Sequence, residues 1–172
     1  ATLSVTITEN TAIILSETHT NVDCNGQATG AIDLTVTDGT APYTFLWSNS
    51  ATTEDITGLT AGTYDVTVTD ALGCTATLSV TITENTAIIL SETHTNVDCN
   101  GQATGAIDLT VTDGTAPYTF LWSNSATTED ITGLTAGTYD VTVTDALGCT
   151  ATLSVTITEN SPILLSETHT DV

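Results

Sequence analysis

The sequence predicts an all-β protein built from tandem immunoglobulin-like β-sandwich domains that form an extended rod. Three observations predict this fold class: a long internal repeat, short segments in which apolar and polar residues alternate, and turn-forming residues between those segments. No segment shows sustained helical periodicity. Six or seven short strands in about 75 residues are typical of an immunoglobulin-like sandwich.

The repeat sets the domain organisation. Residues 1–75 and 76–150 are identical, so the period is 75 residues, a length within the usual range of one domain. A third copy starts at residue 151 and differs only at Ser161, Pro162, Leu164 and Asp171. Because Thr75 to Thr83 reads as one unbroken strand, we expect domains at 11–85 and 86–160. On this interpretation 1–10 is the last strand of a preceding repeat, 161–172 begins a following one, and the chain is a window of a longer array.

Alternation of residue type predicts the strands. From Gly62 to Asp70, the side chains of Tyr64, Val66 and Val68 share one face, and polar side chains occupy the other. The same pattern predicts strands at 13–20, 31–37, 43–47, 55–59 and 75–83. The turns between them carry Gly, Asn, Asp or Pro. We expect an odd strand count to place the two ends of a domain at opposite poles, and six strands to return them to the same pole.

Aromatic residues are the expected core anchors. Tyr43, Phe45 and Trp47 fall on one face of a strand, and the chain has two tryptophans. We expect the core to form around Trp47, Tyr64, Trp122 and Tyr139.

Composition excludes several partners. The chain has no Lys or Arg and 21 acidic residues, for a formal net charge of -21, while 40% of its residues are hydrophobic. The apolar content predicts a folded, anionic protein rather than a disordered acidic tail. Phosphate recognition depends on Lys and Arg, so nucleic acid and direct docking on anionic membranes are excluded as partners.

Two cysteines per repeat indicate an oxidising compartment. Repeat symmetry leaves two sensible pairings: within domains, Cys24 with Cys74 and Cys99 with Cys149, or across the seam, Cys74 with Cys99. The seam bridge requires two strands folded back on one another, so we predict the intradomain pairing. Metal ligation is not favoured, because there is no CxxC pair and at most one histidine per repeat.

Catalysis and cofactors are not expected. The three histidines, His19, His94 and His169, are one residue in three copies, and a glutamate two positions earlier shares its strand face. We interpret this pair as solvated, and no GxSxG motif accompanies the many Ser and Thr residues. Among the carboxylates that recur in each repeat, seven suit Ca²⁺ chemically, but no DxDxDG loop occurs. We therefore expect no cofactor, at most weak Ca²⁺ binding, and no enzyme activity. These seven are Asp23, Asp33, Asp38, Glu54, Asp55, Asp65 and Asp70.

Five motifs occur in both complete copies of the repeat. In the first copy they are G-x-I-x-L-T-V at Gly30 to Val36, a Pro-Tyr step, Trp-Ser-Asn at Trp47 to Asn49, G-L-x-A-G-x-Y-x-V-x-V-x-D at Gly58 to Asp70, and G-C-T-A-T at Gly73 to Thr77. With these motifs the repeat resembles the SprB-type repeat of giant cell-surface adhesins of Bacteroidota. Ser50 stands where the family commonly has glycine. The resemblance implies export, an extracellular location at the cell surface, and a role in adhesion or surface filaments.

The favoured function is a structural or adhesive stalk whose partners are neighbouring repeats of the same chain or filament. The repeat identifies no surface or glycan receptor. One alternative is a filament of separate subunits in which residues 1–10 complete a neighbour's sandwich by strand exchange. A weaker alternative is a carbohydrate-binding module with Trp47 or Tyr43 as the stacking platform; it requires an exposed ring.

Overall fold

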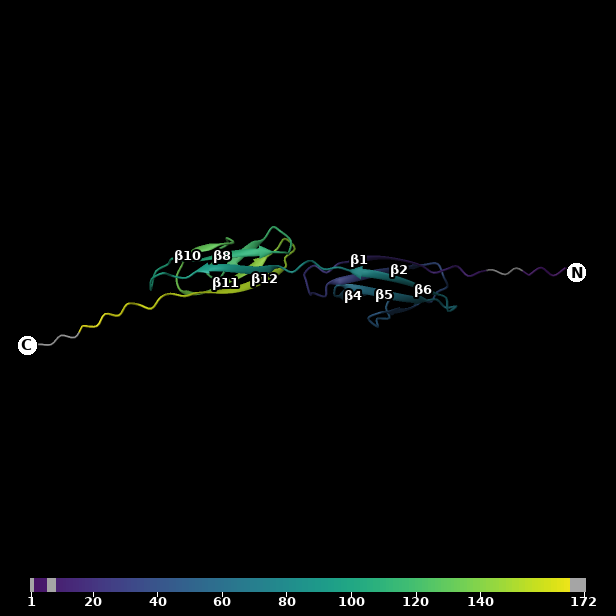
Figure 1. Ribbon diagram of the computed structural model, residues 1–172. Coiled ribbons are helices and arrows are strands. Elements are labelled where there is room, and N and C mark those ends of the chain that lie inside the picture. The colour runs from purple at the N-terminus through teal and green to yellow at the C-terminus, as the bar shows by residue number, and fades with distance from the viewer. Residues whose placement is uncertain (1, 6–8, 168–172) are drawn as a thin grey trace, which may run out of the picture. The chain divides into compact units, whose positions relative to one another are not determined.

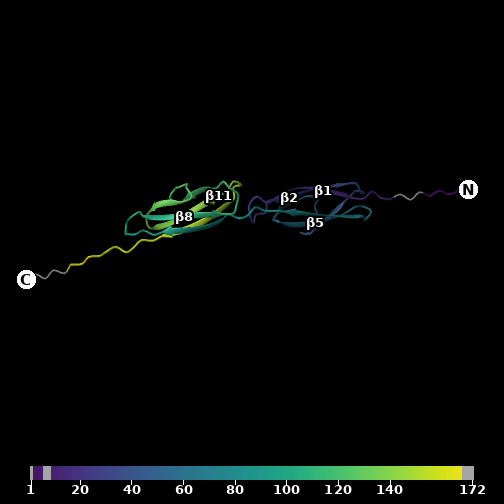
Figure 2. The same cartoon turned by 45° about the horizontal axis from the view of Figure 1, so that its top comes forward.

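The computed structural model describes residues 2–5 and 9–167 of the chain. It divides into two compact units, Ala1–Asn85 and Thr86–Val172, and both are built from β-strands (Figures 1 and 2). No helix in the described part of the chain is long and apolar enough to cross a membrane. The all-β prediction is confirmed.

In the residues that the structure describes, each unit holds six strands, and their ends lie within one residue of the predicted ends. In the first unit they are β1 (Ile14–Thr20), β2 (Gly30–Thr37), β3 (Thr44–Trp47), β4 (Ile56–Leu59), β5 (Gly62–Thr69) and β6 (Thr75–Ile82). In the second they are β7 (Ile89–Thr95), β8 (Gly105–Thr112), β9 (Thr119–Trp122), β10 (Ile131–Leu134), β11 (Gly137–Thr144) and β12 (Thr150–Ile157).

The strands of a unit form two sheets. In the first unit the orders are β1-β2-β4 and β3-β5-β6, and the second unit repeats this as β7-β8-β10 and β9-β11-β12. The buried residues of both sheets form one continuous hydrophobic cluster per unit. This is the two-layer sandwich expected when alternating strands bury one face each.

The tryptophans are buried members of these clusters. Trp47 is 2% exposed and Trp122 is 1% exposed. The indole Nε1 of Trp47 donates a hydrogen bond to the carbonyl oxygen of Thr53 at 2.9 Å, which satisfies the polar end of the ring. Tyr64 is half-buried against the core, and its hydroxyl donates to the carbonyl oxygen of Thr60 at 3.0 Å. This contact to a backbone carbonyl just upstream is the geometry of a tyrosine corner. Tyr139 makes the same contact in the second unit.

Strand direction places the two ends of each unit at opposite poles. Val22, just after β1, forms a parallel bridge with Glu84, just after β6, so these strands run the same way. The antiparallel pairs β1-β2, β2-β4, β3-β5 and β5-β6 fix the other directions. Strands β1, β3, β4 and β6 therefore run one way, and β2 and β5 run the other.

The expectation that six strands return the chain to one pole is therefore wrong. Strands β3 and β4 lie in different sheets and run in the same direction, so residues 48–55 carry the chain back between them. We call the end where β1 and β6 begin the N-pole and the end where they finish the C-pole. In the second unit, Val97 and Glu159 form the equivalent parallel bridge.

Candidate functional site

The poles of each unit hold its cysteines. At the C-pole of the first unit, the loop that follows β1 carries Cys24. The carboxylate Oε2 of Glu84 accepts a hydrogen bond from the backbone N–H of Gly26 at 2.7 Å, and Asn85 Nδ2 donates to the carbonyl oxygen of Asp23 at 2.6 Å. Residues on both sides of Cys24 are thus fastened to the segment that leaves the unit.

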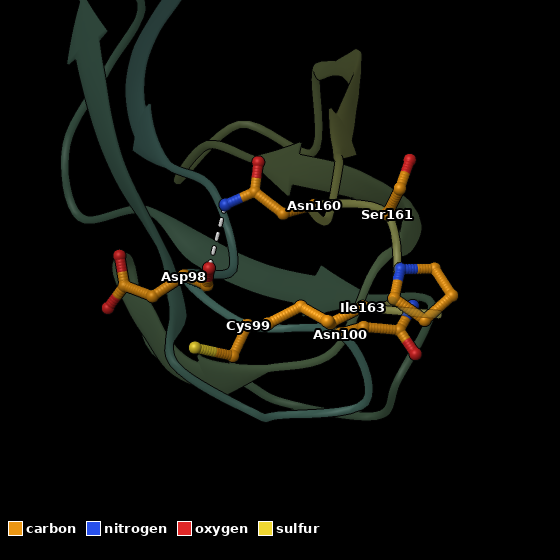
Figure 3. A pocket seen from close by; sticks show the side chains of 7 residues that line it. Asp98, Cys99, Asn100, Asn160, Ser161 and Ile163 are labelled. Carbon is orange, nitrogen blue, oxygen red and sulfur yellow. Dashed lines mark hydrogen bonds between the residues drawn. The ribbon is translucent and has the colours of Figure 1, made fainter. Parts of the chain in front are cut away.

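The C-pole of the second unit has the same bonds. Gly101 donates its backbone N–H to Glu159 at 2.7 Å, and Asn160 Nδ2 donates to the carbonyl oxygen of Asp98 at 2.7 Å (Figure 3). A pocket lies beside this bond, and its lining residues are Asp98, Cys99, Asn100, Asn160, Ser161, Pro162 and Ile163. The exposed Cys99 is therefore part of a recess formed by the C-pole loop and the departing chain.

The N-pole is organised by a buried carboxylate. Asp70 is 5% exposed, and its side chain accepts backbone N–H bonds from Cys74 at 2.8 Å, Leu72 at 2.9 Å and Thr40 at 3.2 Å. Burial raises the pKa of Asp70, but these hydrogen bonds to the charged form outweigh it and hold the pKa below its usual 3.8. Asp145 does the same in the second unit, with its pKa also lowered. The carboxylate thereby fixes the turn that ends at the N-pole cysteine.

The sequence did not predict this role, and Asp70 was considered only as one of the recurring carboxylates that could bind Ca²⁺ weakly. A signal was present: Asp70 directly follows a strand and opens the turn Ala71-Leu72-Gly73. Aspartate favours this position because its short side chain bonds to backbone N–H groups within the following turn.

The predicted intradomain disulfides are wrong. Cys24 and Cys149 are disulfide-bonded, whereas Cys74 and Cys99 carry free, exposed thiols. The alternative bridge between Cys74 and Cys99 is ruled out by the same thiols.

Topology explains why an intradomain bridge cannot form. Cys74 immediately precedes β6 at the N-pole, whereas Cys24 lies in the C-pole loop beside the residues that follow β6. Strand β6 separates these positions, and its eight residues span about 26 Å. A disulfide requires Cα atoms within about 7 Å. The two cysteines of one repeat therefore lie at opposite poles.

Each described histidine pairs with a glutamate carboxylate on an exposed part of its strand. His19 Nδ1 lies 3.0 Å from Glu17 Oε2, and His94 makes the same contact with Glu92 at 3.0 Å. The third copy, His169, lies outside the described residues. Within the described residues, no group of three or more His, Cys, Asp or Glu side chains is arranged to hold a metal ion.

Comparison with known proteins finds one family match in each unit. Residues 16–52 and 91–127 match the SprB repeat family. No curated protein matches the chain.

Three of the solved structures that align with this chain are each matched over less than two thirds of their own length. The three N-terminal domains of the highly immunogenic outer capsid protein of bacteriophage RB49 are 20% identical, with a TM-score of 0.40 and coverage of 86% of this chain and 58% of that one. The eight N-terminal domains of Down syndrome cell adhesion molecule are 8% identical, with a TM-score of 0.45 and coverage of 88% and 25%. A C-terminal fragment of intimin, in complex with the intimin-binding domain of its translocated receptor, is 19% identical, with a TM-score of 0.41 and coverage of 87% and 64%.

At these identities the structural similarity concerns the fold alone. The SprB match covers the same part of each unit, from within β1 to just after the Trp-Ser-Asn turn. Each unit therefore contains one segment that is similar to the SprB repeat.

Proposed function

We propose that each unit is a stiff, non-catalytic module of a secreted stalk at the cell surface, with a structural or adhesive role. The observation that carries this proposal is the parallel bridge between Val22 and Glu84, because it makes the chain enter each unit at one pole and leave at the other. Every added repeat then adds length.

The linker between units supports stiffness. Strand β6 ends at Ile82 and β7 begins at Ile89. Before the division at Asn85, the backbone N–H of Thr83 donates to Asn21 at 2.8 Å. After it, the hydroxyl of Thr86 accepts a bond from the backbone N–H of Gly114 at 3.3 Å. Each half of the linker is thus bonded to its own unit, which leaves little free chain to act as a flexible tether.

The length added per repeat follows from the last strand. From Thr75 at one N-pole to Thr86 at the start of the next unit, the chain runs along β6 and its extension. At about 3.3 Å per residue this gives a rise of about 35 to 40 Å. The net charge of -21 favours an extended array, since like-charged modules repel one another.

The alternatives have less support. Trp47 is 2% exposed, so its ring is not available to stack on a sugar. Tyr43 packs against the core, and its hydroxyl donates to the carbonyl oxygen of Asp38 at 2.9 Å. Assembly by strand exchange needs a sandwich that lacks its last strand, but both units hold their own, β6 and β12.

The proposed partners are neighbouring repeats, and the absence of basic residues argues against nucleic acid and anionic membranes as partners. Small-angle X-ray scattering of the purified two-unit chain tests the stalk. We expect a second peak in the pair-distance distribution at about 35 to 40 Å, the rise given by strand geometry.

The matched control carries a ten-residue Gly-Ser insertion between Asn85 and Thr86, which creates a flexible linker. We expect the peak to broaden in this variant. If the unmodified chain gives a distribution as broad as the insertion variant, the stiff-stalk proposal is wrong.

A further inference from the structure

We propose that the C-pole loop of each unit carries a latent deamidation site, and that a glutamate beyond the last strand holds this site in an unreactive form. The site is an asparagine followed by a glycine, and the sequence has no other such pair outside these loops. Glycine has no side chain to hinder attack by its own backbone nitrogen, so this pair is the most reactive one for asparagine. The pairs are Asn25-Gly26 and Asn100-Gly101, and the glutamates are Glu84 and Glu159.

The reaction needs only water as a co-reactant. The glycine backbone nitrogen attacks Cγ of the asparagine side chain, and the new N–Cγ bond closes a five-membered succinimide ring. The Cγ–Nδ2 bond breaks, and this nitrogen leaves as ammonia with the proton of the glycine N–H. Water then opens the ring at either carbonyl group and leaves aspartate or isoaspartate. Both residues of each pair are exposed, so water reaches them.

Turn geometry keeps the reacting atoms apart. In the second unit the backbone N–H of Gln102 donates to the carbonyl oxygen of Cys99 at 3.0 Å, and Gly101 has φ of 77°. These are features of a type II turn with Asn100 at its first central position, where ψ is about +120°. This ψ directs the glycine nitrogen away from the asparagine side chain, so ring closure requires the turn to open. The equivalent bond of the first unit, 3.1 Å, and its glycine φ of 74° describe the same turn.

The glutamate carboxylate bonds to the groups that react. Glu159 Oε2 accepts the backbone N–H of Gly101 at 2.7 Å, and its Oε1 accepts a bond from Asn100 Nδ2 at 2.8 Å. One carboxylate therefore binds both the attacking nitrogen and the leaving nitrogen. In the first unit, Glu84 Oε2 accepts the backbone N–H of Gly26 at 2.7 Å. Opening the turn must break these charge-assisted bonds, which are stronger than bonds between neutral groups.

The base of the loop is held independently of the glutamate. The backbone N–H of Asp98 donates to Thr104 Oγ1 at 3.1 Å, and its carbonyl oxygen accepts the bond from Asn160 at 2.7 Å. Asn100 itself lines the pocket beside the departing chain (Figure 3). Loss of the glutamate should therefore open the turn locally and leave the rest of the loop in place.

Modification runs one way. Deamidation of Asn100 replaces an amide donor with a carboxylate beside Glu159, and like charges at this distance repel. Isoaspartate also adds a methylene group to the backbone, which changes the spacing of the turn. The modified loop therefore does not return to its closed form, and each event adds one negative charge.

Ageing of the full chain in mildly alkaline buffer tests the proposal. Deamidation is measured as incorporation of heavy oxygen from labelled water by mass spectrometry of the intact chain, and isoaspartate by enzymatic methylation. We expect the Glu84→Ala/Glu159→Ala variant to deamidate about fivefold faster than the unmodified chain, the factor by which one hydrogen bond of ordinary strength shifts a local equilibrium. The matched control, Glu54→Ala/Glu129→Ala, removes the same charge from exposed positions and should age as the unmodified chain does.

Two further variants separate the turn from other sources of reaction. Asn25→Gln/Asn100→Gln removes the proposed sites and gives the background from the remaining asparagines. Val66→Ala/Val141→Ala weakens the core at residues that are 1% exposed, so it reports deamidation through unfolding of the whole unit.

The rates above background decide the outcome. A rate in the Glu84→Ala/Glu159→Ala variant equal to that of the unmodified chain would overturn the proposal, and a lower rate would overturn it by showing that the carboxylate promotes the reaction. An equal increase in the core variant would also overturn it, because unfolding of the unit would then account for the effect.

Discussion

Val22 and Glu84 pair in a parallel bridge, and the backbone N–H of Val22 donates to the carbonyl oxygen of Thr83 at 2.9 Å. This contact joins the end of the first strand of a unit to the end of its last. It shows that β1 and β6 run in the same direction, so the two ends of the six-stranded sandwich lie at opposite poles. It also sets the cysteines apart, because one follows β1 at the C-pole and the other precedes β6 at the N-pole.

Trp47 should contribute a large share of the stability of its unit. Replacing it with alanine removes the largest buried side chain of the first core. We expect the Trp47→Ala variant to lose about 3 to 5 kcal/mol of unfolding free energy in that unit. Urea titration, monitored by the fluorescence of Trp122 and by circular dichroism, should then show separate unfolding transitions for the two units.

The matched control is Leu46→Ala. Leu46 is the adjacent strand residue, and it is 60% exposed, so its loss should change stability by no more than about 0.5 kcal/mol. Similar effects of the two substitutions would contradict the assigned core.

Asp70 and Asp145 should make the protein sensitive to acid. Their pKa values are lowered in the folded state from the usual 3.8. A lowered folded-state pKa contributes stability that is present above the unfolded-state pKa and is lost as the pH falls through the folded-state pKa. We therefore expect the midpoint urea concentration, measured from pH 5 down to pH 2, to decrease once the pH is below about 4.

In the Asp70→Asn/Asp145→Asn variant, the decrease of the urea midpoint in acid should be smaller than in the unmodified chain. Asp33→Asn/Asp108→Asn removes the same charge from exposed positions of β2 and β8, so it reports the general effect of net charge. If the urea midpoint of the Asp70→Asn/Asp145→Asn variant decreases in acid as much as that of the unmodified chain, the N-pole carboxylates do not cause the decrease.

Replacing Ser50 with glycine should stabilise each unit. Ser50 has φ of 70° and Ser125 has φ of 69°, in the left-handed region. A side chain there costs about 1 to 2 kcal/mol, while glycine adds unfolded-state entropy worth about 0.4 to 1 kcal/mol. The double variant Ser50→Gly/Ser125→Gly should therefore gain up to about 1 kcal/mol per unit by thermal unfolding.

The control for this substitution lies in a strand. Ser79→Gly/Ser154→Gly adds the same flexibility in β6 and β12, where extended backbone needs no glycine, and it should lose about 0.5 to 1 kcal/mol. Destabilisation by both double variants would contradict strain at the turn.

Calcium should act mainly by screening charge. The net charge of -21 disfavours the compact state through self-repulsion, and salt reduces this repulsion. Thermal melts should show a gradual rise in midpoint with Ca²⁺ that NaCl partly reproduces at matched ionic strength. A saturable shift at micromolar Ca²⁺, reversed by chelator, would instead establish a specific site.

The sequence by itself determined the local structure. Alternation placed every strand within one residue of its observed ends, because the period-two pattern depends only on which face of a strand is buried. The face that carries Tyr43, Phe45 and Trp47 followed from the same rule. The 75-residue identity of the copies ensured that whatever holds for one unit holds for the other.

The tertiary structure alone decided strand direction and the positions of the cysteines. Alternation is identical for a strand that runs either way, so nothing local shows that β3 and β4 run in the same direction. For the same reason, spacing along the chain did not reveal that Cys24 and Cys74 lie at opposite poles. Asp70 looked like any other acidic turn residue until the fold brought Thr40 to its carboxylate. Each of these features depends on contacts between residues far apart in the sequence, and such contacts form only when the two sheets pack.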